Sequence, residues 1–326
     1  MIITIANHKG GVGKTATAAN LSAALSLKGK KVLAVDLDPQ AALSIALKLN
    51  GSAEDIPDNT YGLLLGRKTT PTNYAKNFDV IPSTLDLAAA EMELSGKIAF
   101  ERILRERLAP FVKSYDYIII DSPPSLGVLA ANALVAADIL VVPVQCEYPA
   151  LKALDMFTTI VERAKLVNPK LKMRLLMTMF TKRTAEAEGA VEEARKNFET
   201  FTPVITRTSM FSRSARKGVP LVMLDGDAEQ ARAYKDFAKE IMNYEETTSR
   251  KSGSNSSCRP RRGDIFPLRR RAPSKKHTPA GRENYNRTEA GRRVPQGVEE
   301  KGFVADGALV TVGNRGRIEN KIGGGR

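Results

Sequence analysis

The stretch Lys9-Gly10-Gly11-Val12-Gly13-Lys14-Thr15 decides how the first part of this 326-residue chain folds. It follows the apolar run Ile2–Ala6, which is typical of a strand, and it leads into Thr15–Lys28, which has helical spacing. A strand, a glycine-rich loop and a helix in this order are the context of a phosphate-binding loop, or P-loop. The sequence therefore predicts a nucleotide site close to the N-terminus.

Each residue of the loop has an expected role. Glycines let successive backbone N–H groups turn toward a phosphate, and the helix N-terminus adds partial positive charge. We expect Lys14 to reach the β- and γ-phosphates of ATP and the Thr15 hydroxyl to coordinate Mg²⁺. The candidate nucleotide-binding residues are Lys9, Gly10, Gly11, Val12, Gly13, Lys14, Thr15 and Ala16.

The loop departs from the standard pattern where it begins. His8 stands where that pattern has glycine, and we assign it no chemical role. Lys9 is a second lysine that opens the loop, and this arrangement defines a known variant of the motif. We therefore treat Lys9 as functional rather than as a solvated loop charge.

Two acidic motifs follow later strands. Lys31–Val35 ends in Asp36-Leu37-Asp38-Pro39-Gln40, and Tyr117–Ile120 ends in Asp121-Ser122-Pro123-Pro124. The carboxyl ends of adjacent parallel strands face one crevice, so these carboxylates are expected beside the P-loop. The site needs a Mg²⁺ ligand, direct or through water, and a group that orients the attacking water. The metal candidates are Thr15, Asp36 and Asp121, and the catalytic candidates are Lys9, Lys14 and Asp38.

Strand-like runs alternate with helical stretches, which predicts an α/β fold with a mostly parallel, doubly wound sheet of the P-loop NTPase type. The expected strands are Ile2–Ala6, Lys31–Val35, Phe78–Ile81, Tyr117–Ile120, Ile139–Val144, Leu175–Met179 and Pro203–Ile205. The expected helices are Thr15–Lys28, Thr84–Leu108, Ala150–Leu166, Ala185–Glu199 and Asp227–Tyr244.

The net charge of +14 is concentrated at the C-terminal end. Residues 1–246 hold 31 basic and 29 acidic side chains, whereas residues 247–326 hold 19 and 7. The second segment is rich in Arg, Gly, Pro and Ser, and it cannot bury enough apolar surface to offset its ordering entropy. We expect an ATPase domain over residues 1–246 and a disordered basic tail over residues 247–326, which is either a functional arm or an unselected extension.

Other features exclude several classes of protein. No apolar run approaches the ~20 residues of a membrane helix. The chain opens directly on a strand without a secretory leader, so we expect a cytoplasmic protein. Cys146 and Cys258 have neither disulfide nor zinc-site spacing.

An ordered series of motifs resembles the ParA/Soj family of DNA-partitioning ATPases, within the deviant-Walker-A group that includes MinD. The resemblance extends over about residues 1–244. It rests on Lys9–Thr15, Asp36–Gln40, Phe78–Ser83, Glu91–Leu94, Tyr115–Gly127, Asn132–Leu134 and Pro143–Tyr148. The Asp-x-Asp-Pro-Gln and Pro-Val-Gln-Cys-Glu-Tyr segments are closer to ParA/Soj than to MinD.

The resemblance implies a mechanism. Lys9 would cross the interface of an ATP-sandwich homodimer, Asp38 would position the hydrolytic water, and Asp121 would lie at the Mg²⁺ shell. The dimer would bind double-stranded DNA without sequence preference, which implies association with the nucleoid. A ParB-like centromere-binding protein would stimulate hydrolysis and release the dimer. Because the sequence begins at the first expected strand, we expect this chain to lack the N-terminal helix-turn-helix region of longer family members.

Three departures from the family pattern matter. Ala16 interrupts the threonines after Lys14, which removes a side-chain contact to the α-phosphate. Thr181 replaces an acid near the expected nucleobase site. The resemblance places DNA contacts near residues 207–217, where an acid of related sequences is replaced and the segment is more basic than usual. The DNA-binding candidates are Arg207, Arg213, Arg216 and Lys217.

Alternatives to DNA segregation start from the same ATPase chemistry. A ParA-type ATPase that positions a protein cargo fits equally well, because the partner selects the cargo. A MinD-like membrane regulator needs an amphipathic C-terminal helix, and Gly313–Arg326 has only two bulky apolar residues. An iron-protein-type reductase needs two cluster cysteines per subunit, and only Cys146 lies in the domain. Nucleic-acid binding driven by the tail is the fourth hypothesis.

Overall fold

Eight strands form one sheet in the part of the chain that the structure describes, which is residues 1–52 and 55–254. The structure is a computed structural model. The strands are β1 (Ile2–Ile5), β2 (Val32–Asp36), β3 (Thr72–Ala75), β4 (Phe78–Ile81), β5 (Tyr117–Asp121), β6 (Ile139–Gln145), β7 (Lys172–Phe180) and β8 (Thr200–Thr206). Their order is β3-β4-β2-β5-β1-β6-β7-β8, and only β3 and β4 pair antiparallel.

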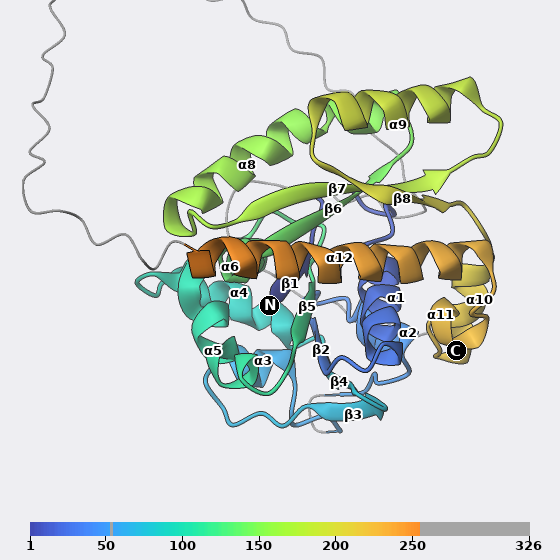
Figure 1. Cartoon of the computed structure of the whole chain (residues 1–326). Coiled ribbons are helices and arrows are strands. Elements are labelled where there is room, and N and C mark those ends of the chain that lie inside the picture. Colours follow the sequence, from blue (N-terminus) through green and yellow to red (C-terminus); the bar gives the residue numbers. More distant parts are fainter. Residues whose placement is uncertain (53–54, 255–326) are drawn as a thin grey trace, which may run out of the picture. The chain divides into compact units, whose positions relative to one another are not determined.

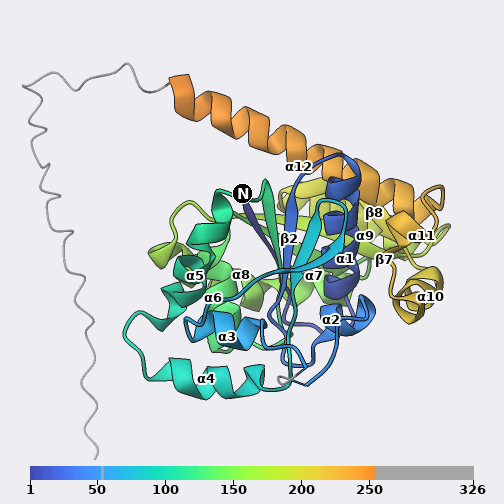
Figure 2. The same cartoon turned by 90° about the horizontal axis from the view of Figure 1, so that it is seen from below.

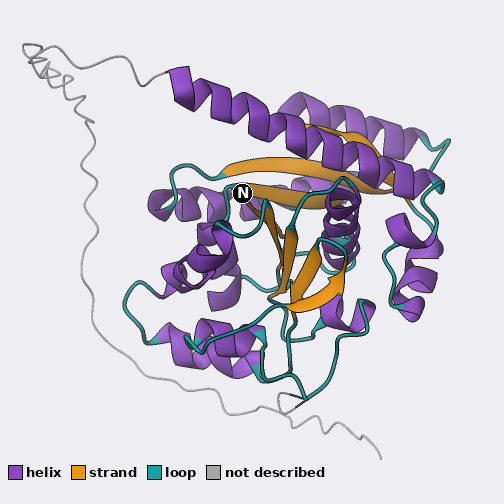
Figure 3. Ribbon diagram, turned by 60° about the horizontal axis from the view of Figure 1, so that its bottom comes forward, coloured by secondary structure: helices purple, strands orange, loops and turns teal. Residues whose placement is uncertain are grey.

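Helices cover both faces of this sheet (Figure 1; Figure 3). The helices are α1 (Lys14–Leu27), α2 (Ala42–Ala46), α3 (Thr60–Leu64), α4 (Leu87–Ser95), α5 (Ile103–Val112), α6 (Val128–Ala136), α7 (Tyr148–Lys152), α8 (Leu154–Val167), α9 (Ala185–Asn197), α10 (Met210–Lys217), α11 (Leu221–Leu224) and α12 (Glu229–Ser254). Side chains alternate between the two faces of a strand. On one face α1, α2, α11 and α12 share a core with Ile3 and Ile5, and on the other Ile2 packs with α3 to α6. Helices α7 to α9 cover β6 and β7 on that second face.

Helix α12 seals the β8 edge of the sheet. It lies along β8 and α1 (Figure 2), and its Phe237 makes an edge-to-face contact with Phe201, with ring centroids 4.7 Å apart. The backbone groups of Thr202 are bound by side chains from both layers. Arg195 Nη2 donates to the Thr202 carbonyl at 2.9 Å, and the Thr202 N–H donates to Glu240 Oε2 at 2.9 Å.

The predicted fold class is confirmed: the sheet is mostly parallel and carries helices on both faces. The prediction of one long helix over Thr84–Leu108 is wrong in detail. Helix α4 ends at Ser95, and a short 3₁₀ turn at Phe100–Arg102 precedes α5. Ala99 adopts a left-handed φ of 54°, which a continuous helix does not allow.

The last helix is also longer than expected. We predicted that it would end at Tyr244, but α12 continues to Ser254 and includes the first residues assigned to the tail. The rest of the predicted basic tail lies outside the described residues. Within the described residues, no helix combines the length and the apolar character that a membrane crossing requires.

Candidate functional site

The P-loop connects β1 to α1 at the carboxyl edge of the sheet. Gly11 and Gly13 have positive φ values of 72° and 91°, which other residues adopt only with strain. No side chain caps the N-terminus of α1, so the first backbone N–H groups of this helix are not bound by a capping side chain. A loop of this shape, with free donors at a helix N-terminus, fits a phosphate group.

Hydrogen bonds to the neighbouring strands β6 and β7 hold the P-loop in place. Asn7 bridges the loop to β6, because its Nδ2 donates to the Pro143 carbonyl at 2.8 Å while its Oδ1 accepts from the Lys9 N–H at 3.0 Å. Thr178 of β7 donates its hydroxyl to the Val12 carbonyl at 2.9 Å. The loop backbone is therefore fixed by the sheet.

Lys14 lies buried within the loop. Its Nζ donates to the Lys9 carbonyl at a long 3.3 Å. Burial lowers the pKa of Lys14, and the carboxylates of Asp121 and Asp38 partly oppose this shift. A phosphate in the loop would add the negative charge that this half-satisfied ammonium lacks.

Asp121 is the least satisfied polar group near the loop. It is fully buried, and neither carboxylate oxygen has a hydrogen-bond partner among the described residues. Burial and then the nearby Asp36 raise the pKa of Asp121 well above its usual value, and the Thr15 hydroxyl and Lys14 only partly oppose this. An isolated buried carboxylate is costly unless a cation or donor joins it.

Asp121 and Thr15 therefore fit a magnesium ion. The part of the chain that the structure describes contains no cluster of three or more His, Cys, Asp or Glu residues able to hold a metal by itself. Mg²⁺ is commonly held by one or two carboxylates together with substrate phosphates and water. The residues present suit an ion that arrives with a nucleotide.

Asp36, at the end of β2, differs from Asp121, its register neighbour on β5. Its oxygens already accept hydrogen bonds from the Asp38 N–H at 3.2 Å, the Ser44 N–H at 2.8 Å and the Ser44 hydroxyl at 2.7 Å. Burial raises the pKa of Asp36 to about 6, although these hydrogen bonds favour the charged form. Asp36 thus organises the loop that carries Asp38, which lies at the same edge as Asp121.

Ser44 and Ser83 are site residues that the sequence did not reveal. Ser44 links two loops, because its hydroxyl also accepts the Ser83 N–H at 2.9 Å. The Ser83 hydroxyl donates to the Asp38 carbonyl at 2.8 Å. Nothing in the local pattern separates these serines from ordinary loop residues, so only the folded arrangement identifies them.

Lys9 is half-buried and is directed toward its own chain. Its Nζ donates to Oε1 of Gln145, the last residue of β6, at 2.7 Å. Gln145 Nε2 lies 3.5 Å from the Gly11 carbonyl. The sequence predicted a role for Lys9 but gave no reason to pair it with Gln145.

The DNA-binding candidates gather around α10. Arg213, Arg216 and Lys217 are on this helix, Arg207 is in the loop before it, and all four are exposed. None of them forms an ion pair within residues 1–52 and 55–254. Helix α10 ends at Gly218, whose φ of 73° and close approach to Lys48 exclude a larger residue without strain.

A small hollow separates α10 from the P-loop. Its volume is about 100 Å³, and it is lined by Thr15 and Ala16 at the start of α1 and by Phe211 and Ser214 of α10. Asn20 joins α1 to the neighbouring helix α11, because its Oδ1 accepts the Val222 N–H at 3.1 Å while its Nδ2 donates to the Ala16 carbonyl at 2.8 Å. The basic surface is thus one packing layer from the phosphate loop.

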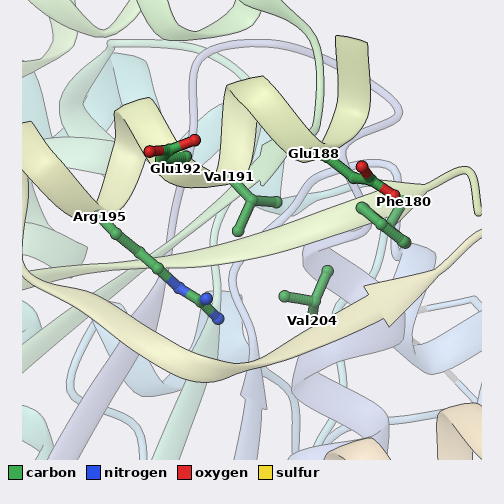
Figure 4. Close-up of a pocket in the computed structure, with 6 residues that line it drawn as sticks. All are labelled: Phe180, Glu188, Val191, Glu192, Arg195 and Val204. Carbon is green, nitrogen blue, oxygen red and sulfur yellow. The ribbon is translucent and has the colours of Figure 1, made fainter. Parts of the chain in front are cut away.

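A different hollow lies between α9 and β8, with a volume of about 430 Å³. In Figure 4, Val191 and Val204 face each other across it and Arg195 extends from α9 toward the strand. Arg195 is already bound to the Thr202 carbonyl. Because this hollow has a mainly apolar lining and no phosphate-binding loop, we assign the nucleotide site to the P-loop.

Comparison with known proteins identifies the family of this chain. Residues 1–173 match a family model described as AAA domain. The chain is 40% identical over 248 residues to the sporulation initiation inhibitor protein Soj of Bacillus subtilis (strain 168), which covers 74% of this chain and 97% of that protein. It is 39% identical over 250 residues to the chromosome partitioning protein ParA of Myxococcus xanthus (strain DK1622). This match covers 74% of this chain and 87% of that protein. The chain belongs to the ParA/Soj family of partitioning ATPases.

Solved structures of ParA/Soj-like fold extend the comparison. A plasmid partition protein of Borrelia burgdorferi B31, bound to AMPPNP, superimposes with a TM-score of 0.63 at 30% identity and covers 75% of this chain and 98% of its own. A cobyrinic acid a,c-diamide synthase of Mycobacterium smegmatis, bound to ADP and magnesium, superimposes with a TM-score of 0.66 at 31% identity. This match covers 76% of this chain and 96% of that chain. The two names differ in function, so similarity at this level establishes the fold and not one reaction.

Replacing the buried charge of Asp121 should stabilise this ParA/Soj-family protein in the absence of ligand. We expect Asp121→Asn to raise the free energy of unfolding by on the order of 1–3 kcal/mol at neutral pH, because a desolvated charge is removed. Urea unfolding in EDTA without nucleotide measures this. The gain should shrink as the pH falls, since protonation of wild-type Asp121 removes the same charge. A destabilised Asp121→Asn protein would contradict this account.

Proposed function

We propose that this chain is an ATP-dependent switch that segregates DNA, either a plasmid or a chromosome. One observation carries the proposal: in a chain of the ParA/Soj family, a P-loop with two lysines lies beside Asp121, a buried carboxylate with no hydrogen-bond partner among the described residues. The ATP-bound form pairs with a second copy and binds DNA, and hydrolysis ends this state.

ATP and Mg²⁺ bind at the carboxyl edge of the sheet. Backbone N–H groups at the start of α1 bind the phosphates, and Lys14 approaches the β- and γ-phosphates. Thr15 and Asp121 would hold Mg²⁺, which when bound would neutralise charge on the phosphate oxygens. The oxygens of Asp36 already accept hydrogen bonds from Ser44, so Asp36 would contribute negative charge close to the ion.

Hydrolysis depends on Asp38. The hydrogen bonds of Asp36 and Ser83 fix its backbone, and the Gln40 N–H donates to its Oδ1 at 2.9 Å. A carboxylate held in this way orients a water for attack on the γ-phosphate. No arginine in the matched catalytic motifs serves as a finger in the same chain, so intrinsic turnover is slow and a ParB-like partner raises it.

Pairing and DNA binding follow from Lys9 and from the α10 surface. Lys9 reaches the nucleotide of a second copy in an ATP-sandwich dimer. The two copies of Arg207, Arg213, Arg216 and Lys217 then present twice as many phosphate contacts, which makes DNA binding depend on ATP. The protein acts in the cytoplasm, on the nucleoid, with no membrane partner.

The two lysines should have separable roles. We expect Lys14→Ala to weaken ATP binding by about 100-fold or more, because a charge-assisted contact within the loop is lost. Lys9→Ala should retain most of the affinity but should not dimerise with ATP. Calorimetry measures binding, and light scattering measures mass with ATP and with ADP. A Lys9→Ala protein that still dimerises would exclude the contact between subunits.

Asp38→Ala should bind ATP and form a dimer that persists. Loss of the group that orients water should slow hydrolysis by ~10²–10⁴-fold. Phosphate release gives the rate, and size-exclusion chromatography gives the lifetime of the dimer. Asp86→Ala, an exposed aspartate on another loop, is the control. Equal turnover in Asp38→Ala and wild type would remove Asp38 from the mechanism.

DNA binding should separate into two components. Arg213→Glu with Arg216→Glu should abolish ATP-dependent binding, whereas the control pair Arg163→Glu with Lys196→Glu, on α8 and α9, should not. Each lost phosphate contact makes the negative slope of log affinity against log salt shallower by about 0.9. Truncation after Ser254, where α12 ends, should remove ATP-independent binding only. Loss of all binding on truncation would favour the tail-driven hypothesis.

A further inference from the structure

Lys9 is held by a specific partner on its own chain. The 2.7 Å contact from its Nζ to Gln145 Oε1 is a charge-assisted hydrogen bond, which is stronger than one between neutral groups. Both side chains are half-buried, so water competes less for the ammonium than it would on an open loop.

Gln145 cannot move with Lys9, because its backbone is part of the sheet. It pairs in register with Thr178 of β7, and the next residue, Cys146, donates its N–H to the Thr178 carbonyl at 3.0 Å. The same Thr178 side chain holds the loop carbonyl of Val12. The sheet therefore fixes the backbone of Gln145, and Lys9 must break this bond to reach another molecule.

We propose that Gln145 is a positioning residue that holds Lys9 on its own chain and so sets the ATP concentration at which two copies pair. This inference rests on the proposed function, in which Lys9 contacts the nucleotide of the partner. A bond that is present in the single chain and given up on pairing makes pairing less favourable. For a bond to a charged group, the expected effect is about tenfold in the pairing constant.

Two substitutions change this bond in opposite directions. Gln145→Leu has similar size and removes the acceptor, so Lys9 is released. Gln145→Glu keeps an oxygen acceptor and adds a negative charge, so Lys9 is held more firmly. A purely structural role for Gln145 predicts that both substitutions impair the protein in the same direction.

The first measurement needs neither ATP nor pairing. Nucleotide-free protein is treated briefly with the N-hydroxysuccinimide ester of acetic acid, and acetylation of Lys9 is quantified by mass spectrometry relative to Lys170, which is exposed. We expect Gln145→Leu to increase the Lys9 to Lys170 ratio severalfold and Gln145→Glu to decrease it. Equal ratios in the three proteins would overturn the proposal.

The second measurement is the ATP concentration at half-maximal dimerisation, from light scattering. It should fall about three- to tenfold in Gln145→Leu and rise in Gln145→Glu. Added charge also repels phosphates, so ADP affinity is measured for Gln145→Glu in the wild-type and Lys9→Ala backgrounds. If Gln145→Glu lowers ADP affinity by the same factor in both backgrounds, that factor measures direct repulsion of the phosphates. The dimerisation midpoint of Gln145→Glu is then corrected by this factor. Midpoints that do not move in opposite directions after this correction would overturn the proposal.

These arms separate two kinds of failure. Wild-type protein that does not dimerise with ATP would refute the proposed function, whereas the acetylation ratios would still decide whether Gln145 holds Lys9. Unfolding midpoints of both variants establish that they fold. If Gln145→Leu is unstable, the acetylation ratio of Gln145→Glu alone decides the question.

Discussion

The buried carboxylate of Asp121 is the constraint on which the rest of the site depends. Parallel pairing of β1, β2 and β5 brings Asp36 and Asp121 to one edge, in register, where burial and then the charge of Asp36 raise the pKa of Asp121. Asp36 is satisfied by Ser44, whereas the Asp121 oxygens have no hydrogen-bond partner among the described residues. Lys14 and the Thr15 hydroxyl partly oppose this cost from nearby, and a bound cation would relieve the rest.

The loop beside this carboxylate combines a fixed backbone with one movable side chain. Asn7 and Thr178 tie the loop to β6 and β7, so the phosphate donors keep their geometry without a ligand. Lys9 has a side-chain partner that it can exchange for another. Asn20 ties α1 to α11, and a small hollow lies between the start of α1 and Phe211 of α10. The basic residues of α10 therefore lie close to the start of α1.

The sequence predicted those parts of the site that local chemistry dictates. Glycines before a lysine at a strand end identify the loop, and aspartates after apolar runs identify the carboxyl edge. It did not predict the pairing of Lys9 with Gln145 or the link from Ser44 to Ser83, because residues far apart in the chain meet only through strand order. The break after Ser95 was missed because Leu87, Ala90 and Leu94 keep helical spacing right up to it. Roles of individual site residues stay predictions until variants are measured.

The hydrogen bonds that Arg195 and Glu240 make to the β8 edge have a consequence for how this protein can assemble. An exposed edge strand invites another chain to add to the sheet, which leads to fibres or aggregates. Here both backbone groups of Thr202 are occupied by Arg195 and Glu240, and Pro203 has no N–H to offer. Strand addition is therefore disfavoured at Thr202 and Pro203. Copies of this protein at high local concentration are less able to join their sheets through this part of β8.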